Sequence, residues 1–91
     1  MKYMVHWKID KKDLDAVIDK FMESEKRPNP EKYPKTVAGP YYFHNKMEGF
    51  TIYEVENEDQ IINYHLYWID LMETKWKSVS ESMDFIKKYK K

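Results

Sequence analysis

Apolar and polar residues alternate at the start of the chain, in the stretch KYMVHWKI at residues 2–9. One face of this stretch carries Tyr3, Val5, Trp7 and Ile9. The other face carries Met4, His6 and Lys8. A period of two is typical of a β-strand, so we expect a strand here with one face directed to a core.

The spacing changes to that of a helix after this strand. Asp10 is placed to cap the new element. The following apolar positions, which have the i, i+3, i+4, i+7 spacing of one helical face, are Leu14, Val17, Ile18, Phe21 and Met22. This pattern predicts an amphipathic helix with a single buried stripe.

Residues 25–35 contain three prolines and six charged residues. Neither a helix nor a central strand continues through such a segment, so we predict a surface loop and a candidate lid over a cleft. Two strand-like runs follow at residues 35–44 and 49–56. The residues between them, 45–49, include Asn45 and Gly49, which suit the positive φ values of a hairpin loop.

The second half of the chain repeats the change from strand to helix. A helix is predicted to open at residues 57–59, with a broad apolar face that includes His65 as a core histidine. A short fourth strand is predicted at residues 75–79. Ser78 and Glu81 have the spacing of a capping box before a short terminal helix. The apolar residues of that terminal helix are Met83, Phe85, Ile86 and Tyr89.

In chain order these elements read β-α-β-β-α-β plus a C-terminal helix, which is the ferredoxin-like arrangement. Right-handed crossovers place both crossover helices on one face of a four-stranded antiparallel sheet. We therefore predict a single α+β domain over residues 1–91, with the other sheet face left uncovered.

Composition narrows the functional classes. Basic and acidic residues number 16 each, so no net field directs the protein to nucleic acid or to an anionic membrane, and we expect neither partner. Neither a signal peptide nor a run of ~20 apolar residues is present, which favours a cytoplasmic protein. The chain has no cysteine, and its three histidines lack the spacing of helical metal sites, so we expect no metal and no cofactor.

Several short motifs together resemble a family. They are MKYMVHWKI at the start, the pair Phe43-His44, the run GFTIYE from Gly49, and Trp68 followed by Asp70-Leu71. The chain resembles an uncharacterised domain-of-unknown-function family of the dimeric α/β-barrel superfamily. The resemblance implies a homodimer whose two sheets pack face to face, in a superfamily that includes monooxygenases, isomerases, haem-degrading enzymes and ligand-binding modules.

The period of two also assigns side chains to faces. With a hairpin loop at residues 45–49, the face expected to meet the dimer partner or to line a cleft carries Tyr42, His44, Phe50, Ile52 and Glu54. His6 joins this face if the first and third strands pair in an even register. His44 and Glu54 then lie roughly 13 Å apart along the ladder. We therefore expect His6 to pair with Glu54.

These residues define the candidate site. The predicted pocket is bounded by His6, Tyr42, His44, Ile52 and Glu54, of which His6, His44 and Glu54 are the candidate catalytic groups. The favoured function is the binding of a small apolar or aromatic molecule between or beside the sheets of a homodimer. Two alternatives stay open, a cofactor-independent monooxygenase or isomerase, and a structural interaction module without a ligand.

Overall fold

The computed structural model describes residues 1–90. Its main elements, in chain order, are β1 (Lys2–Ile9), α1 (Leu14–Ser24), β2 (Lys35–Tyr42), β3 (Glu48–Glu54), α2 (Glu58–Trp68), β4 (Met72–Val79) and α3 (Ser82–Tyr89). Two short 3-10 turns, Lys11–Asp13 and Pro30–Lys32, precede α1 and β2. The predicted order of strands and helices is confirmed.

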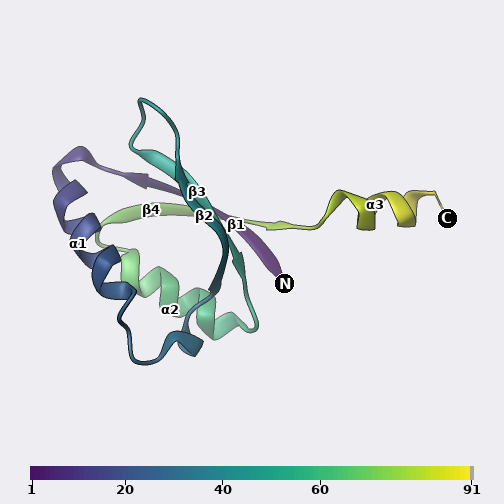
Figure 1. The fold of residues 1–91 in the computed structure, drawn as a ribbon, viewed down its shortest axis with the longest axis horizontal. Coiled ribbons are helices and arrows are strands. Elements are labelled where there is room, and N and C mark those ends of the chain that lie inside the picture. Colours follow the sequence, from purple (N-terminus) through teal and green to yellow (C-terminus); the bar gives the residue numbers. More distant parts are fainter. Residues whose placement is uncertain (91) are drawn as a thin grey trace.

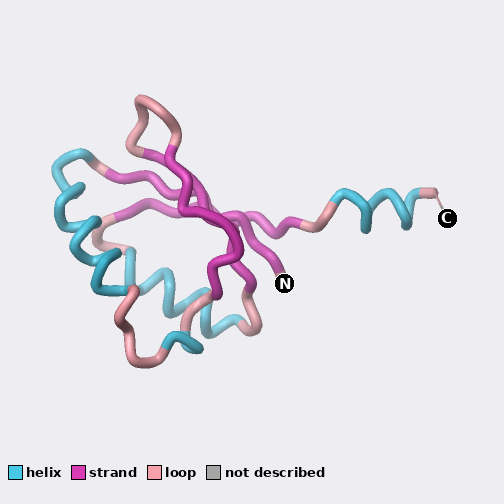
Figure 2. The backbone as a smooth tube through the Cα atoms, in the orientation of Figure 1, coloured by secondary structure: helices cyan, strands magenta, loops and turns pink. Residues whose placement is uncertain are grey.

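The four strands form one antiparallel sheet in the order β2-β3-β1-β4. Figure 1 shows α1 and α2 on the same side of this sheet, while α3 extends away from it. The tube in Figure 2 shows the strongly twisted strands curving around that helix layer. The molecule is thus an α+β protein with a four-stranded antiparallel sheet, and its element order is that of a ferredoxin-like arrangement.

The core lies between the sheet and its two covering helices. Five buried residues form it, namely Val5, Ile9, Val17, Tyr64 and Trp68. The side chains of β1 alternate as predicted. The odd-numbered residues face this core, and the even-numbered residues face away from it. The even register of β1 and β3 is also confirmed, with His6 opposite Phe50 and Met4 opposite Ile52.

The expected pairing of β2 with β3 is wrong. Tyr41 lies opposite Phe50 and Tyr42 opposite Gly49, where the prediction placed His44 and Tyr42 opposite Phe50 and Ile52. Two register shifts interrupt β2, one between Thr36 and Ala38 and one between Ala38 and Tyr41. Each shift reverses the faces of the residues beyond it, so the two together cancel, and the wrong assignment comes from the hairpin loop, which covers residues 43–47 and not 45–49. The hairpin loop does use positive φ at Asn45, as predicted.

Helix α2 buries Tyr64 and Trp68 from the broad apolar face predicted for it, together with one polar residue, and leaves other residues of that face exposed. Its buried residues are Gln60, Tyr64 and Trp68. His65 is exposed, which corrects its prediction as a core histidine. The apolar arc of this helix is wide enough to allow several orientations, and the burial of polar Gln60 decides between them.

Gln60 is buried because both ends of its amide are hydrogen bonded. Its Oε1 accepts from the backbone N–H of Glu56 (2.8 Å), and its Nε2 donates to the carbonyl oxygen of Glu31 (2.8 Å). Asn63 Nδ2 donates to the carbonyl oxygen of Lys32 (2.9 Å). Helix α2 therefore anchors the loop before β2, the segment that the sequence predicted as a surface loop and candidate lid.

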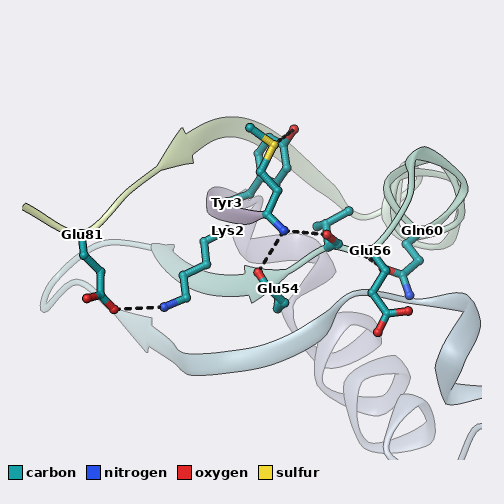
Figure 3. Close-up of polar contacts among 8 residues, drawn as sticks. Lys2, Tyr3, Glu54, Glu56, Gln60 and Glu81 are labelled. Carbon is teal, nitrogen blue, oxygen red and sulfur yellow. Dashed lines mark hydrogen bonds and ion pairs between the residues drawn. The ribbon is translucent and has the colours of Figure 1, made fainter. Parts of the chain in front are cut away.

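The end of the chain leaves the body of the molecule. Strand β4 begins three residues earlier than predicted, at Met72, and α3 follows it with every residue exposed. The predicted capping box is absent, because Glu81 is the N-cap and its side chain makes no capping hydrogen bond. Instead Glu81 Oε1 accepts from Lys2 Nζ at 3.3 Å, which ties the start of α3 to β1 (Figure 3).

We expect Gly49→Ala to destabilise the fold by about 2 kcal/mol or more, because a Cβ at this position would overlap with the indole of Trp7 and the carbonyl oxygen of Tyr41. Urea denaturation followed by tryptophan fluorescence measures the change. Ser80→Ala, an exposed position between β4 and α3, serves as the control and should change the free energy of unfolding by less than about 0.5 kcal/mol. Equal stabilities of the two variants would contradict this packing.

Candidate functional site

A cavity lies on the helix side of the sheet, between the strands and α1. It has a volume of about 240 Å³, and we call it the apolar chamber. Its lining residues come from the sheet, α1 and α2, and are Trp7, Ile9, Leu14, Val17, Ile18, Phe21, Pro40, Thr51, Tyr53, Tyr64, Trp68 and Met72. Ile18 and Phe21 are partly exposed, so the chamber reaches the surface beside α1.

Local packing fixes the floor of the apolar chamber. Trp7 projects from the middle of β1 over Gly49, which has no side chain to displace the indole. The indole Nε1–H donates to Thr51 Oγ1 at 3.2 Å, which satisfies the ring's only polar atom. The floor thus presents aromatic carbon with no free donor from Trp7.

A second, more polar cavity adjoins the first. This polar chamber has a volume of about 130 Å³ and shares four lining residues with the apolar chamber, Phe21, Tyr53, Tyr64 and Trp68. Its remaining lining residues are Ser24, Glu25, Arg27, Tyr33, Pro34 and Thr36. The two chambers therefore adjoin each other at these four side chains, one chamber apolar and the other more polar.

Aromatic rings hold Arg27 at the polar chamber. Its guanidinium carbon lies 3.5 Å from the ring centre of Tyr33 and 4.8 Å from that of Tyr67. Tyr67 is itself held by α1, because its hydroxyl donates to the carbonyl oxygen of Lys20 at 3.1 Å. The cation–π contacts fix the plane of the guanidinium.

The two tyrosines shared by both chambers stay protonated. Burial raises the pKa of Tyr64, and the neighbouring Tyr53 raises it further, while the charge of Arg27 opposes the change. Burial also raises the pKa of Tyr53, against the opposing effects of hydrogen bonding to Tyr64 and Thr51 and of the Arg27 charge. Both phenols are therefore neutral hydroxyl groups, able to donate a hydrogen bond at ordinary pH.

The residues predicted to form the pocket do not converge. His6 and Ile52 lie on the sheet face away from the helices, while His44 lies on the exposed hairpin turn. Tyr42 belongs to the helix side, opposite Gly49, because the hairpin loop covers residues 43–47 and not the predicted 45–49. A shallow depression of about 210 Å³ does lie on the face that carries His6, but its lining residues are Met4, His6, Phe43 and Phe50.

The predicted pairing of His6 with Glu54 is wrong. His6 Nε2 lies 3.1 Å from Glu48 Oε1, whereas Glu54 lies opposite Lys2, four residues farther along the ladder. Glu54 Oε2 instead lies 3.2 Å from the N-terminal ammonium of Met1 (Figure 3). That ammonium also donates to the carbonyl oxygen of Val55 at 2.9 Å. Antiparallel pairing matches the start of one strand with the end of its neighbour, so the middle of β1 lies far from Glu54.

Sequence reasoning missed the two chambers, although signals for them exist. Trp7 and Tyr53 occupy strand positions assigned to the core, and a core built from such large flat rings packs with gaps. Arg27 is the single arginine among the 16 basic residues of the chain. Arginine and lysine are not interchangeable where a planar group stacks on rings, so a lone arginine in the same loop as Tyr33 was a usable signal.

The fold and the site together define an α+β protein with a two-part cavity between its sheet and its helices. Comparison with known families identifies the chain further. It matches a domain of unknown function, DUF3303, over residues 1–91, and belongs to that family. No curated protein matches the chain significantly.

Residues 1–90 were also compared with the requirements of a metal site and of a membrane-spanning helix. In this part of the chain, no group of three or more His, Asp or Glu side chains is arranged to hold a metal ion. The helices described in these residues are also too short or too polar to cross a membrane.

We expect the free energy of unfolding to fall as the pH rises above 10.0, the ordinary pKa of tyrosine. Above that pH the unfolded chain releases the phenol protons of Tyr53 and Tyr64, while the folded protein keeps them. For each proton that only the folded protein retains, the free energy of unfolding falls by up to about 1.4 kcal/mol per pH unit. Urea titrations between pH 8 and about 11 test this, with tyrosinate absorbance as a second readout. Tyr64→Phe should have a shallower pH dependence, and an unchanged slope would contradict the burial effect.

Proposed function

We propose that the protein binds a small apolar, ring-containing molecule in the apolar chamber. The observation that supports this function is the chamber itself. It is a hollow of about 240 Å³ that opens to the surface beside α1, so a small molecule can enter it. Its walls are tryptophan, tyrosine and aliphatic side chains, the lining that is typical of small-molecule sites. Its flat aromatic walls suit a planar ligand.

The position of the chamber fits a binding role better than a packing defect. Its walls come from both layers, so a ligand would bridge the sheet and α1. Helix α1 contributes only one fully buried residue, Val17, to the core. A bound ring would supply the contacts that this helix lacks and would stabilise the protein in proportion to its occupancy.

We also propose that two copies pair through the sheet face that carries no helix. This open sheet face carries half-buried apolar side chains although no layer covers it within residues 1–90; its central apolar residues are Met4, Phe50 and Ile52. Phe43 lies beside it, with ring-centre distances of 6.1 Å to His6 and 6.0 Å to Phe50. Resemblance to the dimeric α/β-barrel superfamily favours a second copy as the occupant.

The protruding helix supports the same pairing. Met83, Phe85 and Ile86 of α3 are exposed, and the helix lies apart from the rest of its own chain (Figure 1). An apolar helix face in water is stabilised by packing against a partner. A second copy seated on the open sheet face would bring its own body within reach of this arm.

The ligand proposal is tested with N-phenyl-1-naphthylamine, a neutral aromatic dye whose fluorescence rises in apolar surroundings. We expect Ile18→Trp, which fills the apolar chamber, to weaken dye binding about tenfold or more, the effect of losing roughly 1.4 kcal/mol. Met22→Trp adds the same ring on α1 but outside the chamber, and should bind the dye as the unmodified protein does. Absence of dye binding, or equal loss in both variants, would overturn the proposal.

Sedimentation velocity tests the pairing. We expect Phe50→Glu to raise the dimer dissociation constant by about 30-fold or more, because it buries a charge at the centre of the contact. Ile62→Glu places the same charge on an exposed apolar position of α2, in the helix layer, and should leave the dimer intact. A monomeric parent protein would refute the dimer, and dissociation by Ile62→Glu alone would place the contact on the helix layer.

A further inference from the structure

We propose that the ligand of the two chambers is amphipathic, with an apolar ring body in the apolar chamber and one carboxylate bound by Arg27 in the polar chamber. This inference rests on the proposed function and adds the chemical class of the ligand. It is carried by the adjoining geometry of the chambers and by the unused hydrogen-bond donors of Arg27.

Arg27 is stacked but not neutralised. It takes part in none of the ion pairs found among residues 1–90, and its Nε is buried without a hydrogen-bond partner in that part of the chain. Stacking on Tyr33 and Tyr67 engages the face of the guanidinium and leaves its in-plane N–H groups free. A buried donor without a partner is costly, and a carboxylate is the acceptor that the guanidinium edge matches in a bidentate pair.

The polar chamber offers further donors to the same carboxylate. The hydroxyl groups of Thr36, Tyr53 and Tyr64 belong to its lining. Both tyrosines stay protonated and add no negative charge. The O–H of Tyr64 is engaged with Tyr53, so the hydroxyl groups left to donate to a carboxylate are those of Thr36 and Tyr53. The charge of Arg27 already acts on Tyr53 and Tyr64, which places all three groups within electrostatic reach of one another.

Size and charge point to a single carboxylate. The polar chamber has only about 130 Å³ and contains one cationic side chain, Arg27. Glu25 lines the same chamber and would repel a second negative charge. Glu25 is exposed and forms no ion pair with Arg27, so its carboxylate is free to remain in water. A dianion such as a phosphate monoester fits these features less well.

The test compares 2-naphthoate with 2-naphthamide, which share one ring system and differ by the charge of the head group. Both are measured by displacement of N-phenyl-1-naphthylamine and directly by equilibrium dialysis. In the unmodified protein we expect 2-naphthoate to bind about tenfold more tightly than 2-naphthamide. Arg27→Gln should remove this preference, because it weakens the binding of 2-naphthoate about tenfold and the binding of 2-naphthamide by less.

Two matched variants control for nonspecific charge effects. Lys26→Gln removes a neighbouring exposed cation that does not line the polar chamber, and should keep the preference for 2-naphthoate. Glu25→Gln removes the repelling carboxylate and should strengthen 2-naphthoate binding by about two- to fivefold. Circular dichroism of each variant checks that the fold is retained.

The outcomes separate this inference from the proposed function. If Ile18→Trp blocks dye binding, the apolar site stands. The carboxylate site is nevertheless overturned if the unmodified protein does not prefer 2-naphthoate to 2-naphthamide, or if Arg27→Gln keeps that preference. Failure of the dye and of both naphthalene compounds to bind overturns both proposals. Loss of 2-naphthoate and 2-naphthamide binding alike in Arg27→Gln shows that Arg27 acts through packing, which also overturns the inference.

Discussion

A four-stranded sheet has two faces, and this chain covers only one of them with helices. Helices α1 and α2 lie on the same side of the sheet (Figure 1), as right-handed crossovers would place them. Everything else in the structure depends on this one-sided layering. The core is a single layer between sheet and helices, the opposite face keeps its apolar residues near water, and α3 continues from β4 beyond the edge of the body.

Within the covered side, large aromatic rings replace the small aliphatic residues that fill most cores. Tyr64 packs edge to face against both Tyr53 and Trp76, with ring-centre distances of 5.2 Å for each pair. Such rings bury much apolar area, yet their rigid shapes leave spaces where three elements meet. The two chambers lie at such a junction, next to α1. Aromatic packing therefore explains both the stability of the core and the presence of a site within it.

Much of the fold was predictable from local patterns. Strict alternation in β1 gave its two faces, because a period of two leaves no choice once one face is buried. The even register with β3 was an assumption, which the structure confirms. The prediction for β2 was wrong because the hairpin loop, and not alternation, sets its register with β3. The loop covers residues 43–47 and not 45–49, so Tyr42 lies opposite Gly49 on the helix side. The two register shifts within β2 cancel, so Thr36 and Tyr42 share one face. The predicted pocket was wrong for the same reason, because the predicted register was used to place Tyr42 and His44 on its face.

The sequence by itself determined the order of the elements, the face of β1 that is buried and the absence of cysteine chemistry. These follow from periodicity and composition, which act within one element at a time. Only the tertiary structure decided where Arg27 lies, which face of α2 is buried and where the cavity forms. Those outcomes depend on contacts between segments far apart in the chain, such as Gln60 with Glu31 and Arg27 with Tyr67, and no local pattern encodes such contacts.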